Sequence, residues 1–298
     1  MNSPHTYTRL RVALVENSPA LAATDARLRD IITFAADNTG KLVRARLVFA
    51  AAQAHGLEGG AAERLACAVE YFHVASLLLD DLPCMDDAFT RRGRPCAHKV
   101  YGEAPAILGA LAFINRAYAL SGFAFAMYPA DVRMQATACL DACLGPAGLL
   151  GGQAADLSFA ESDRSARAVS AVAMRKTGAL FWLAVYFPAL LAAPSPGELR
   201  ALKALCVYWG QAYQAADDLQ DALMNAFEAG KTTGRDRALT RPNLAHAIGV
   251  PAAQARIARL LEQARRAVAV LDGKSARWSY LGGFHREFVE PMVGAVAA

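Results

Sequence analysis

Alanine- and leucine-rich stretches fill most of this chain, and apolar and polar residues nowhere alternate for more than a few positions. Such stretches favour helices, whereas a half-buried strand needs sustained alternation. With 298 residues, 55% of them hydrophobic, the chain can bury a large core. Length alone allows two domains, but we find no repeat and no linker rich in Pro, Gly or Ser. The sequence therefore predicts an all-α fold, a single-domain helical bundle around an apolar cavity over 1–298, with an N-terminal arm at 1–25.

Proline and glycine indicate where the helices begin and end. Proline suits the first position of a helix and cannot continue one. Helices are therefore expected to open at Pro129, Pro146 and Pro196, and the N-terminal arm is expected to hold one or two short helices. The predicted helices beyond the arm cover residues 25–37, 41–55, 61–81, 104–128, 129–144, 146–160, 165–176, 178–191, 196–226 and 252–271.

An acidic cluster ends one of the long apolar helices. It comprises Asp80, Asp81, Asp86 and Asp87, and Pro83 stops the helix between the two pairs. Four carboxylates this close repel one another, and a carboxylate at a helix C-terminus opposes the helix dipole, so a cation is expected there. On a continuous helix Asp86 would lie roughly 240° round from Asp80. The turn at Pro83 is therefore needed to bring both to one site.

A second acidic cluster, Asp217, Asp218 and Asp221, closes another apolar segment. Asp217 and Asp221 are four residues apart and share a helix face, with Gln214 one turn earlier on a neighbouring face. Oxygen ligands without nearby His or Cys suit Mg²⁺, which completes its shell with water and substrate phosphates. Either cluster alone could be a solvated helix end, but the two together favour a magnesium–phosphate site.

Basic side chains accompany both clusters. Arg91 and Arg92 follow the first cluster, Lys231 follows the second, and Lys176 interrupts an apolar stretch. The arginines could simply neutralise Asp86 and Asp87 rather than bind a ligand.

A further basic group lies nearer the N-terminus. Lys41 and Arg44, three apart at a predicted helix start, are expected to share one face, and His73 lies two turns before Asp80. They could instead be a solvated helix start and a core histidine. Taken with the other cations, however, they leave enough charge to hold a second diphosphate without metal. Two diphosphates in one apolar-walled bundle describe a condensation reaction.

Several other classes of protein are not indicated. A net charge of +4 is too small to suggest nucleic-acid binding, and no basic stripe with interleaved aromatics appears. The six cysteines lack zinc spacing, and the N-terminus lacks a signal pattern, so we expect a reducing cytoplasm. Residues 177–197 carry no charge and match a membrane span in length, but Pro188, Pro194 and Pro196 interrupt them. We expect a buried helix lining the cavity, and no membrane span.

Together these motifs resemble those of trans-isoprenyl diphosphate synthases over roughly residues 35–250. That family has an Asp-rich motif followed by Arg-Arg-Gly, which is similar to residues 80–93 almost position for position. The segments 152–157, 176–180 and 213–221 also fit, as does the loop containing Lys231 and Asp236. The segment 82–88 is most similar to bacterial geranylgeranyl diphosphate synthases.

The resemblance implies a bundle of the isoprenoid synthase type that condenses isopentenyl diphosphate with dimethylallyl, geranyl or farnesyl diphosphate. It implies three Mg²⁺ ions on the allylic diphosphate and a homodimer. The implied metal-site residues, not all direct ligands, are Asp80, Asp81, Asp86, Asp217, Asp218 and Asp221. The residues implied to hold the allylic diphosphate are Arg91, Lys176 and Lys231, and those implied at the reacting centre are Thr177 and Gln214. The residues implied to hold isopentenyl diphosphate are Lys41, Arg44, His73 and Arg92.

Some positions depart from the family's pattern. Leu42 and Ala45 stand where an Arg and a Pro are usual, Leu111 stands where an Asp is common, and Arg241 replaces a Lys. None of these changes removes a metal-site carboxylate. The property they affect is the affinity for isopentenyl diphosphate.

Two rival functions remain open at this point. A class I terpene cyclase shares the metal-bound Asp cluster on a helical fold, but it needs only one diphosphate site. A non-catalytic partner subunit of a heteromeric synthase could dispense with its acidic clusters, whereas this chain keeps both.

Product length is predicted from the helix that ends at Asp80. The prenyl tail is expected to run back along this helix, past the small Ala75 and Ser76, to a floor formed by Tyr71 and Phe72. The resemblance implies that a bulky aromatic at position 75 stops the product at fifteen carbons. One helical turn rises ~5.4 Å, close to one isoprene unit, so we expect geranylgeranyl diphosphate, with farnesyl diphosphate as the alternative. The two aromatics could instead pack in the core or in the dimer interface, and another helix would then set the product length.

Overall fold

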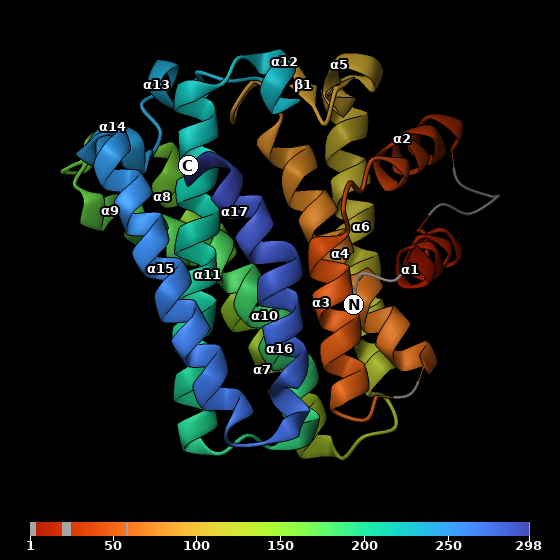
Figure 1. Ribbon diagram of the computed structural model, residues 1–298. Coiled ribbons are helices and arrows are strands. Elements are labelled where there is room, and N and C mark those ends of the chain that lie inside the picture. Colours follow the sequence, from red (N-terminus) through yellow and green to blue (C-terminus); the bar gives the residue numbers. More distant parts are fainter. Residues whose placement is uncertain (1–3, 20–24, 58, 298) are drawn as a thin grey trace.

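In the computed structural model, residues 4–19, 25–57 and 59–297 are described, and they form a bundle of long helices with short elements across one end (Figure 1). The elements of the first half are α1 (Pro4–Glu16), α2 (Ala26–Asp37), α3 (Val43–Ala54), α4 (Gly59–Asp80), β1 (Thr90–Arg91), β2 (Arg94–Pro95), α5 (Ala97–Tyr101), α6 (Glu103–Phe125), α7 (Ala130–Leu144) and α8 (Leu149–Leu157). Next come a 3₁₀ turn (Phe159–Glu161), α9 (Ala166–Ala173), a π-helical turn (Met174–Gly178), α10 (Ala179–Ala189), a 3₁₀ turn (Leu190–Ala192) and α11 (Pro196–Leu223). The chain ends with α12 (Ala226–Ala229), α13 (Arg235–Ala238), α14 (Leu244–Ile248), α15 (Val250–Asp272), a 3₁₀ turn (Ala276–Trp278), α16 (Ser279–Phe284), a π-helical turn (His285–Val289) and α17 (Glu290–Ala297).

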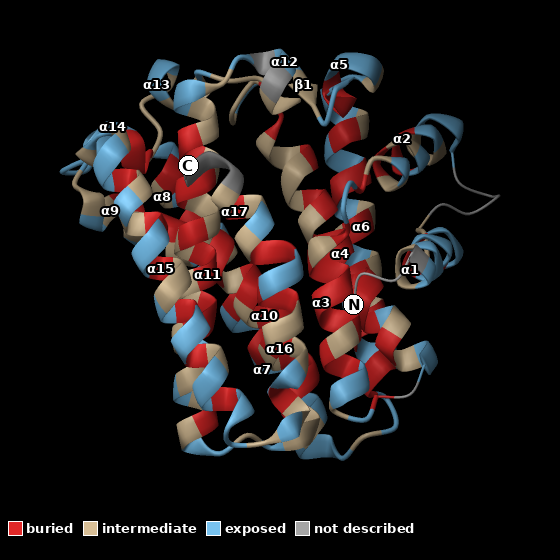
Figure 2. Cartoon of the chain, in the orientation of Figure 1, coloured by how far each residue is buried: buried red, intermediate tan, exposed pale blue. Residues whose placement is uncertain are grey.

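Helix α10 lies at the centre of the bundle and packs against α3, α4, α7 and α11. Eight of its eleven residues are buried, among them Pro188 in the last turn, which has no N–H to donate within the helix. Figure 2 shows the buried residues gathered on the inward faces of the long helices. Two stretches, Glu103–Phe125 and Ala166–Ala192, have the length and composition of membrane spans, but 56% of the most apolar window of the second is buried. Residues 179–189 are therefore the buried core helix that we expected.

The prediction of an all-helical fold is confirmed, and several helix starts follow from their capping residues. Asp25 caps α2 by accepting hydrogen bonds from the N–H groups of Arg27 and Leu28. Ser195 and Glu198 form a capping box at α11, which begins with a proline as predicted. Each of these caps satisfies N–H groups that the helix itself leaves without partners.

Two predicted helix starts are wrong. Helix α3 begins at Val43 rather than Lys41, because Leu42 has a left-handed backbone (φ 51°) that a helix cannot include. Lys41 therefore does not share a helix face with Arg44. Helix α8 begins at Leu149 rather than Pro146, because the Gly148 N–H donates to the Gly145 carbonyl (3.0 Å) and closes a turn instead.

Candidate active site

A cavity of about 510 Å³ opens between α4, α8 and α11 toward the end of the bundle that carries the short elements. Charged residues line its mouth: Arg44, His73, Asp80, Asp86, Arg91, Arg92, Asp156, Lys176, Asp217, Asp221, Lys231, Arg235, Asp236 and Arg241. Apolar and aromatic residues line its deeper part: Phe72, Ala75, Leu79, Ile114, Tyr118, Leu144, Leu149, Leu150, Val169, Val172 and Leu180. The site thus joins a polar mouth to an apolar interior.

The turn after α4 brings two carboxylates of the first cluster together, as predicted. The Asp86 N–H donates to the Asp80 carbonyl (2.9 Å), and the Asp87 N–H donates to the Leu82 carbonyl (2.9 Å). Asp80 and Asp86 therefore both line the cavity. Burial raises the pKa of Asp86 to about 6, with the Lys176 charge acting against the rise and the Asp80 carboxylate adding to it.

The second aspartate of each Asp-Asp pair does not line the cavity. Asp81 is buried and accepts two hydrogen bonds from Arg91 Nε (2.8 and 3.0 Å). Asp218 accepts from the Leu244 N–H (2.8 Å) and from Gln214 Nε2 (2.9 Å), and burial raises its pKa. Asp81 thus fixes the hairpin to α4, and Asp218 fixes the start of α14 to α11.

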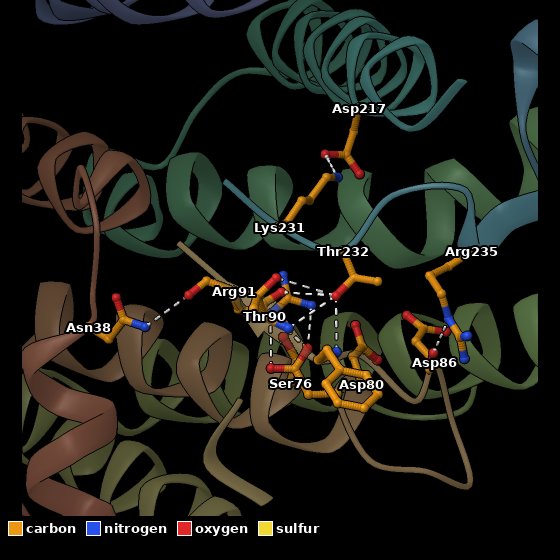
Figure 3. Close-up of polar contacts among 12 residues, drawn as sticks. Asn38, Ser76, Asp80, Asp86, Thr90, Arg91, Asp217, Lys231, Thr232 and Arg235 are labelled. Carbon is orange, nitrogen blue, oxygen red and sulfur yellow. Dashed lines mark hydrogen bonds and ion pairs between the residues drawn. The ribbon is translucent and has the colours of Figure 1, made fainter. Parts of the chain in front are cut away.

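Lysines pair with the carboxylates that do line the cavity. Lys176 Nζ lies 2.6 Å from Asp156 Oδ2 and 3.5 Å from Asp80 Oδ2. Burial lowers the pKa of Lys176, but these carboxylates raise it by more, so the ammonium stays charged. Lys231 Nζ pairs with Asp217 Oδ1 across the mouth (Figure 3). Burial acts to raise the pKa of the Asp217 carboxyl, but Lys231, with the charges of Arg91 and Lys176, lowers it by more.

Lys176 and Thr177 project from the π-helical turn that separates α9 and α10. Turns of this kind are frequent at functional sites. The turn packs against two glycines: a Cβ at Gly152 of α8 would lie 2.6 Å from Lys176 N, and one at Gly210 of α11 would lie 2.9 Å from Gly178 Cα. This close packing lets the Thr177 hydroxyl donate to Gln214 Oε1 (2.8 Å), so both residues line the cavity as predicted.

The hairpin β1–β2 positions Arg91 opposite Lys231. Both of its turn residues, Arg92 (φ 55°) and Gly93 (φ 74°), have left-handed backbones, as a type I′ turn requires. The loop after α12 adds to the hairpin: the Gly93 N–H donates to the Gly230 carbonyl (2.8 Å) and the Thr232 N–H to that of Thr90 (3.1 Å). Figure 3 shows Thr232 beside Thr90 and Arg91. Cations that follow the two acidic clusters thus meet in space.

The second basic group surrounds a buried acid. Arg44 Nη1 lies 3.3 Å from His73 Nε2, and Arg92 donates to the Asn38 carbonyl. Burial raises the pKa of the Glu70 carboxyl above its ordinary value, although the charges of Arg44 and Arg92 act to lower it. Burial and the neighbouring guanidinium groups lower the pKa of His73, so the ring is neutral at pH 7. Arg44, His73 and Arg92 line the cavity together, as predicted.

Two positions on either side of Arg44, Lys41 and Ala45, differ from expectation in their role. The Ala45 N–H donates to Glu70 Oε2 (3.2 Å), a bond that the proline usual at this position could not make. This departure therefore ties Glu70 to α3. Lys41 is exposed, precedes α3 and is not among the residues that line the cavity. Its proposed contact with a diphosphate stays a prediction.

Of the two aromatics predicted to form the floor of the cavity, one is placed there and the other is not. Phe72, Ala75 and Ser76 line the cavity, but Tyr71 does not. Tyr71 lies about 100° round the helix from Phe72 and donates its hydroxyl to the Leu14 carbonyl of α1. The alternative reading, that an aromatic packs in the core, therefore holds for Tyr71.

Three charged residues at the mouth had no site role assigned to them from the sequence. Arg241 Nη2 donates to the Met85 carbonyl (2.7 Å), with Nε 3.4 Å from Asp86 Oδ1, and Arg235 Nε donates to the Asp86 carbonyl (2.8 Å). Asp156, which pairs with Lys176, lies in one of the segments that resemble the family, and Arg241 was named only as a departure from the family's pattern. Those motif positions were the available signals, whereas Arg235 stands in a loop with no regular pattern.

The donor set fits a hard divalent cation. Asp80, Asp86, Asp217 and Asp221 line the mouth, and Asp221 Oδ2 is buried with no hydrogen-bond partner among the described residues. Carboxylate oxygens are the ligands that Mg²⁺ prefers, with phosphate and water completing its shell. Within the described ranges no three His, Cys, Asp or Glu side chains already converge on one point. Water and substrate phosphate oxygens would complete the shell of a cation bound here.

Comparison with known proteins agrees with this geometry. A geranylgeranyl diphosphate synthase of Pseudescherichia vulneris is 34% identical over 268 residues, which cover 88% of this chain and 85% of that protein. A farnesyl diphosphate synthase of Geobacillus stearothermophilus is 29% identical over 257 residues, covering 86% of each. The crystal structure of an FPP/GFPP synthase from Zymomonas mobilis superimposes with a TM-score of 0.79 at 28% identity over 96% of both chains.

The fold and the family follow from two further matches. A geranyltransferase from Helicobacter pylori, complexed with magnesium and isoprenyl diphosphate, has the same fold, with a TM-score of 0.82 at 24% identity over 96% of this chain and 97% of that one. Residues 25–273 match the family model for polyprenyl synthetases. The chain therefore belongs to the polyprenyl synthetase family, whose members use Mg²⁺, and is a trans-prenyltransferase.

Proposed function

We propose that this enzyme condenses isopentenyl diphosphate head-to-tail with an allylic diphosphate and releases geranylgeranyl diphosphate as its main product. The observation that carries the proposal is the form of the cavity. Two separate groups of cations at its mouth can hold two diphosphates, and an apolar interior can hold a growing prenyl tail. A class I terpene cyclase would leave the group Arg44, His73 and Arg92 without a ligand.

The first group of residues would hold the allylic diphosphate. Asp80, Asp86, Asp217 and Asp221 would bind Mg²⁺, three ions by the resemblance, and bound Mg²⁺ would supply charge neutralisation for the leaving group. Arg91, Lys176 and Lys231 would stabilise the negative charge that develops on the departing diphosphate. Arg91 and Lys176 are already held in place by Asp81 and Asp156, so little reorganisation of these two cations is needed.

The second group would orient isopentenyl diphosphate so that its double bond faces the allylic carbon. Arg44 and Arg92 would bind its phosphates, and the short distance between the reacting carbons would supply much of the rate. Thr177 and Gln214 would line the reacting centre. His73 has a lowered pKa and is a weak base, so we assign the proton lost by the product to the departed diphosphate. The apolar interior keeps water from the carbocation.

Two observations support a twenty-carbon product. The small residues Ala75 and Ser76 leave the passage open below Asp80, on the way to Phe72. The Pseudescherichia vulneris relative, named a geranylgeranyl diphosphate synthase, agrees with this length. Farnesyl diphosphate is the second candidate, supported by the Geobacillus stearothermophilus relative, named a farnesyl diphosphate synthase.

Turnover by the purified chain alone tests the proposal. Isopentenyl diphosphate, farnesyl diphosphate and Mg²⁺ are expected to give geranylgeranyl diphosphate, detected by chromatography after dephosphorylation. A non-catalytic subunit would give no product, and a cyclase would convert an allylic diphosphate without consuming isopentenyl diphosphate. Either result would overturn the proposal.

We also propose a cytoplasmic homodimer formed through α6. The exposed face of α6 carries Ile107, Leu108, Leu111, Tyr118 and Phe123, each at least 40% exposed, and from Ala104 to Phe125 no charged side chain on it is exposed. Apolar surface of this extent is what association covers. The six cysteines are free, which suits a reducing compartment.

A further inference from the structure

The side chain of Arg241 joins the segment before α14 to the loop after α4 and to the end of α8. Its Nη2 donates to the Met85 carbonyl (2.7 Å), and its Nη1 donates to the Asp156 carbonyl (3.3 Å). Its Nε lies 3.4 Å from Asp86 Oδ1, and the side chain is only 9% exposed. One buried guanidinium therefore holds three partners from two other elements, and little water can take its place.

The backbone on both sides of Arg241 is fixed to the second acidic cluster. Thr240 has a left-handed backbone (φ 55°), which is unfavourable for a β-branched residue and persists only where the surroundings hold it. The Arg241 N–H donates to the Asp236 carbonyl (2.8 Å). Two residues later, Asn243 Nδ2 donates to the Asp218 carbonyl of α11 (3.0 Å). Arg241 thus reaches toward the first acidic cluster from a segment that is anchored at the second.

We propose that Arg241 is a positioning residue, which sets the separation of the two acidic clusters and thereby the affinity of the site for Mg²⁺. This inference rests on the proposed function, because it takes Asp86 of the first cluster and Asp217 of the second as residues that hold Mg²⁺ on one diphosphate. Mg²⁺ demands near-octahedral geometry, so it binds less tightly when one carboxylate is displaced. This role differs from the effect on isopentenyl diphosphate that the sequence led us to expect for Arg241.

The guanidinium group matters here as well as its charge. Its planar fork presents several N–H donors in fixed directions, whereas the ammonium of a lysine is a single point charge. The lysine that is usual in the family would keep a positive charge near Asp86, but it lacks the fork that reaches the carbonyl oxygens of Met85 and Asp156 together. The variants Arg241→Ala and Arg241→Lys therefore separate the loss of the whole side chain from the loss of the fork alone.

Binding of Mg²⁺ in the presence of inorganic diphosphate tests this inference without any turnover. Titration calorimetry of the full-length protein gives the dissociation constant for Mg²⁺. Arg241→Ala is expected to weaken Mg²⁺ binding by about ten- to a hundredfold, as the loss of a group that orients a metal ligand does, and Arg241→Lys is expected to weaken it as well. In steady-state kinetics the Mg²⁺ concentration for half-maximal activity should rise in parallel, while KM for isopentenyl diphosphate should stay at the wild-type value.

Arg237→Ala is the matched control. Arg237 lies in the neighbouring α13, but it is exposed and is not among the residues that line the cavity, so its loss should leave Mg²⁺ binding unchanged. Wild-type Mg²⁺ binding by Arg241→Ala would overturn the inference. Wild-type binding by Arg241→Lys would also overturn it, because charge alone would then suffice, and this outcome decides the question if Arg241→Ala does not fold. A wild-type protein that binds Mg²⁺ and diphosphate but forms no condensation product would overturn the proposed function, and that result is seen before any variant is made.

Discussion

Replacing Gly210 by alanine would test whether close packing of α11 against the π-helical turn positions Lys176 and Thr177. The new Cβ would lie 2.9 Å from Gly178 Cα and 3.1 Å from Gly178 N. Carbon atoms prefer separations of about 3.5–4.0 Å. Because the obstructing atoms belong to backbone, α11 and the turn must move apart by roughly 0.5–1 Å to restore such a separation.

The expected cost has two parts. Overpacking of this kind destabilises by about 1–3 kcal/mol, against which the better helix propensity of alanine returns about 1 kcal/mol. The same displacement lengthens the 2.8 Å hydrogen bond between Thr177 and Gln214. A misplacement of about 1 Å at a reacting centre can lower the rate by about a hundredfold. We therefore expect a modest loss of stability and a large loss of kcat.

Thermal unfolding and steady-state kinetics of Gly210→Ala would be measured beside Gly60→Ala. Gly60 lies in the first turn of α4 and has open space where its Cβ would stand, so its alanine variant should be at least as stable as the wild type and equally active. If Gly210→Ala had the same melting temperature and the same kcat as Gly60→Ala, the reasoning would be refuted.

Four further predictions concern the charges and the assembly. EDTA should abolish activity and Mg²⁺ restore it, and Asp80→Ala should lower kcat by orders of magnitude; full activity of that variant would contradict the metal assignment. Arg92→Ala should raise KM mainly for isopentenyl diphosphate, by about ten- to a hundredfold, because a lost charge-assisted hydrogen bond costs ~1.5–3 kcal/mol. Lys231→Ala should instead lower the rate with the allylic substrate. The reverse pattern would show that the two groups of basic residues are assigned to the wrong diphosphates. Burial acts to raise the pKa of Glu198, but hydrogen bonds from Trp278, Ser195 and Arg277 lower it by more, to about 2. Because this pKa is below the unfolded value of about 4.3, the free energy of unfolding should fall as the pH drops from about 4.5 toward 2. Glu198→Gln should flatten that dependence in acid denaturation curves. Light scattering at micromolar concentration should give the mass of a dimer, and Leu111→Glu should give a monomer; a monomeric wild type would exclude α6 as an interface.

Much of the site was predictable because its elements follow from local chemistry. Pro83 stops α4, so the chain must turn there, and the turn returns Asp86 to the side of Asp80. The hairpin β1–β2 was not predicted from the sequence. Spacing along α11 correctly placed Gln214, Asp217 and Asp221 toward one cavity.

What could not be predicted depends on the rotation and contacts of whole elements. Periodicity shows that α4 is apolar on nearly every side, so it cannot say whether Tyr71 or Phe72 meets the cavity. The left-handed backbone of Leu42 is set by tertiary packing, since leucine has no local preference for it. Arg235 and Arg241 reach Asp86 only because the loop after α11 folds back over α4, a contact across about 150 residues.

The two aspartates of each Asp-Asp pair make different contacts, and this difference affects how mutagenesis of such motifs should be interpreted. An alanine scan would score Asp80 and Asp81 alike as essential, although one carboxylate faces the cavity and the other holds Arg91. Loss of Asp81 would leave the half-buried Arg91 guanidinium without its hydrogen-bonded carboxylate, a defect of folding and of loop geometry that excess metal could not rescue. Metal titration of each variant therefore distinguishes a ligand from a scaffold residue, and sequence identity at both positions does not imply one shared role.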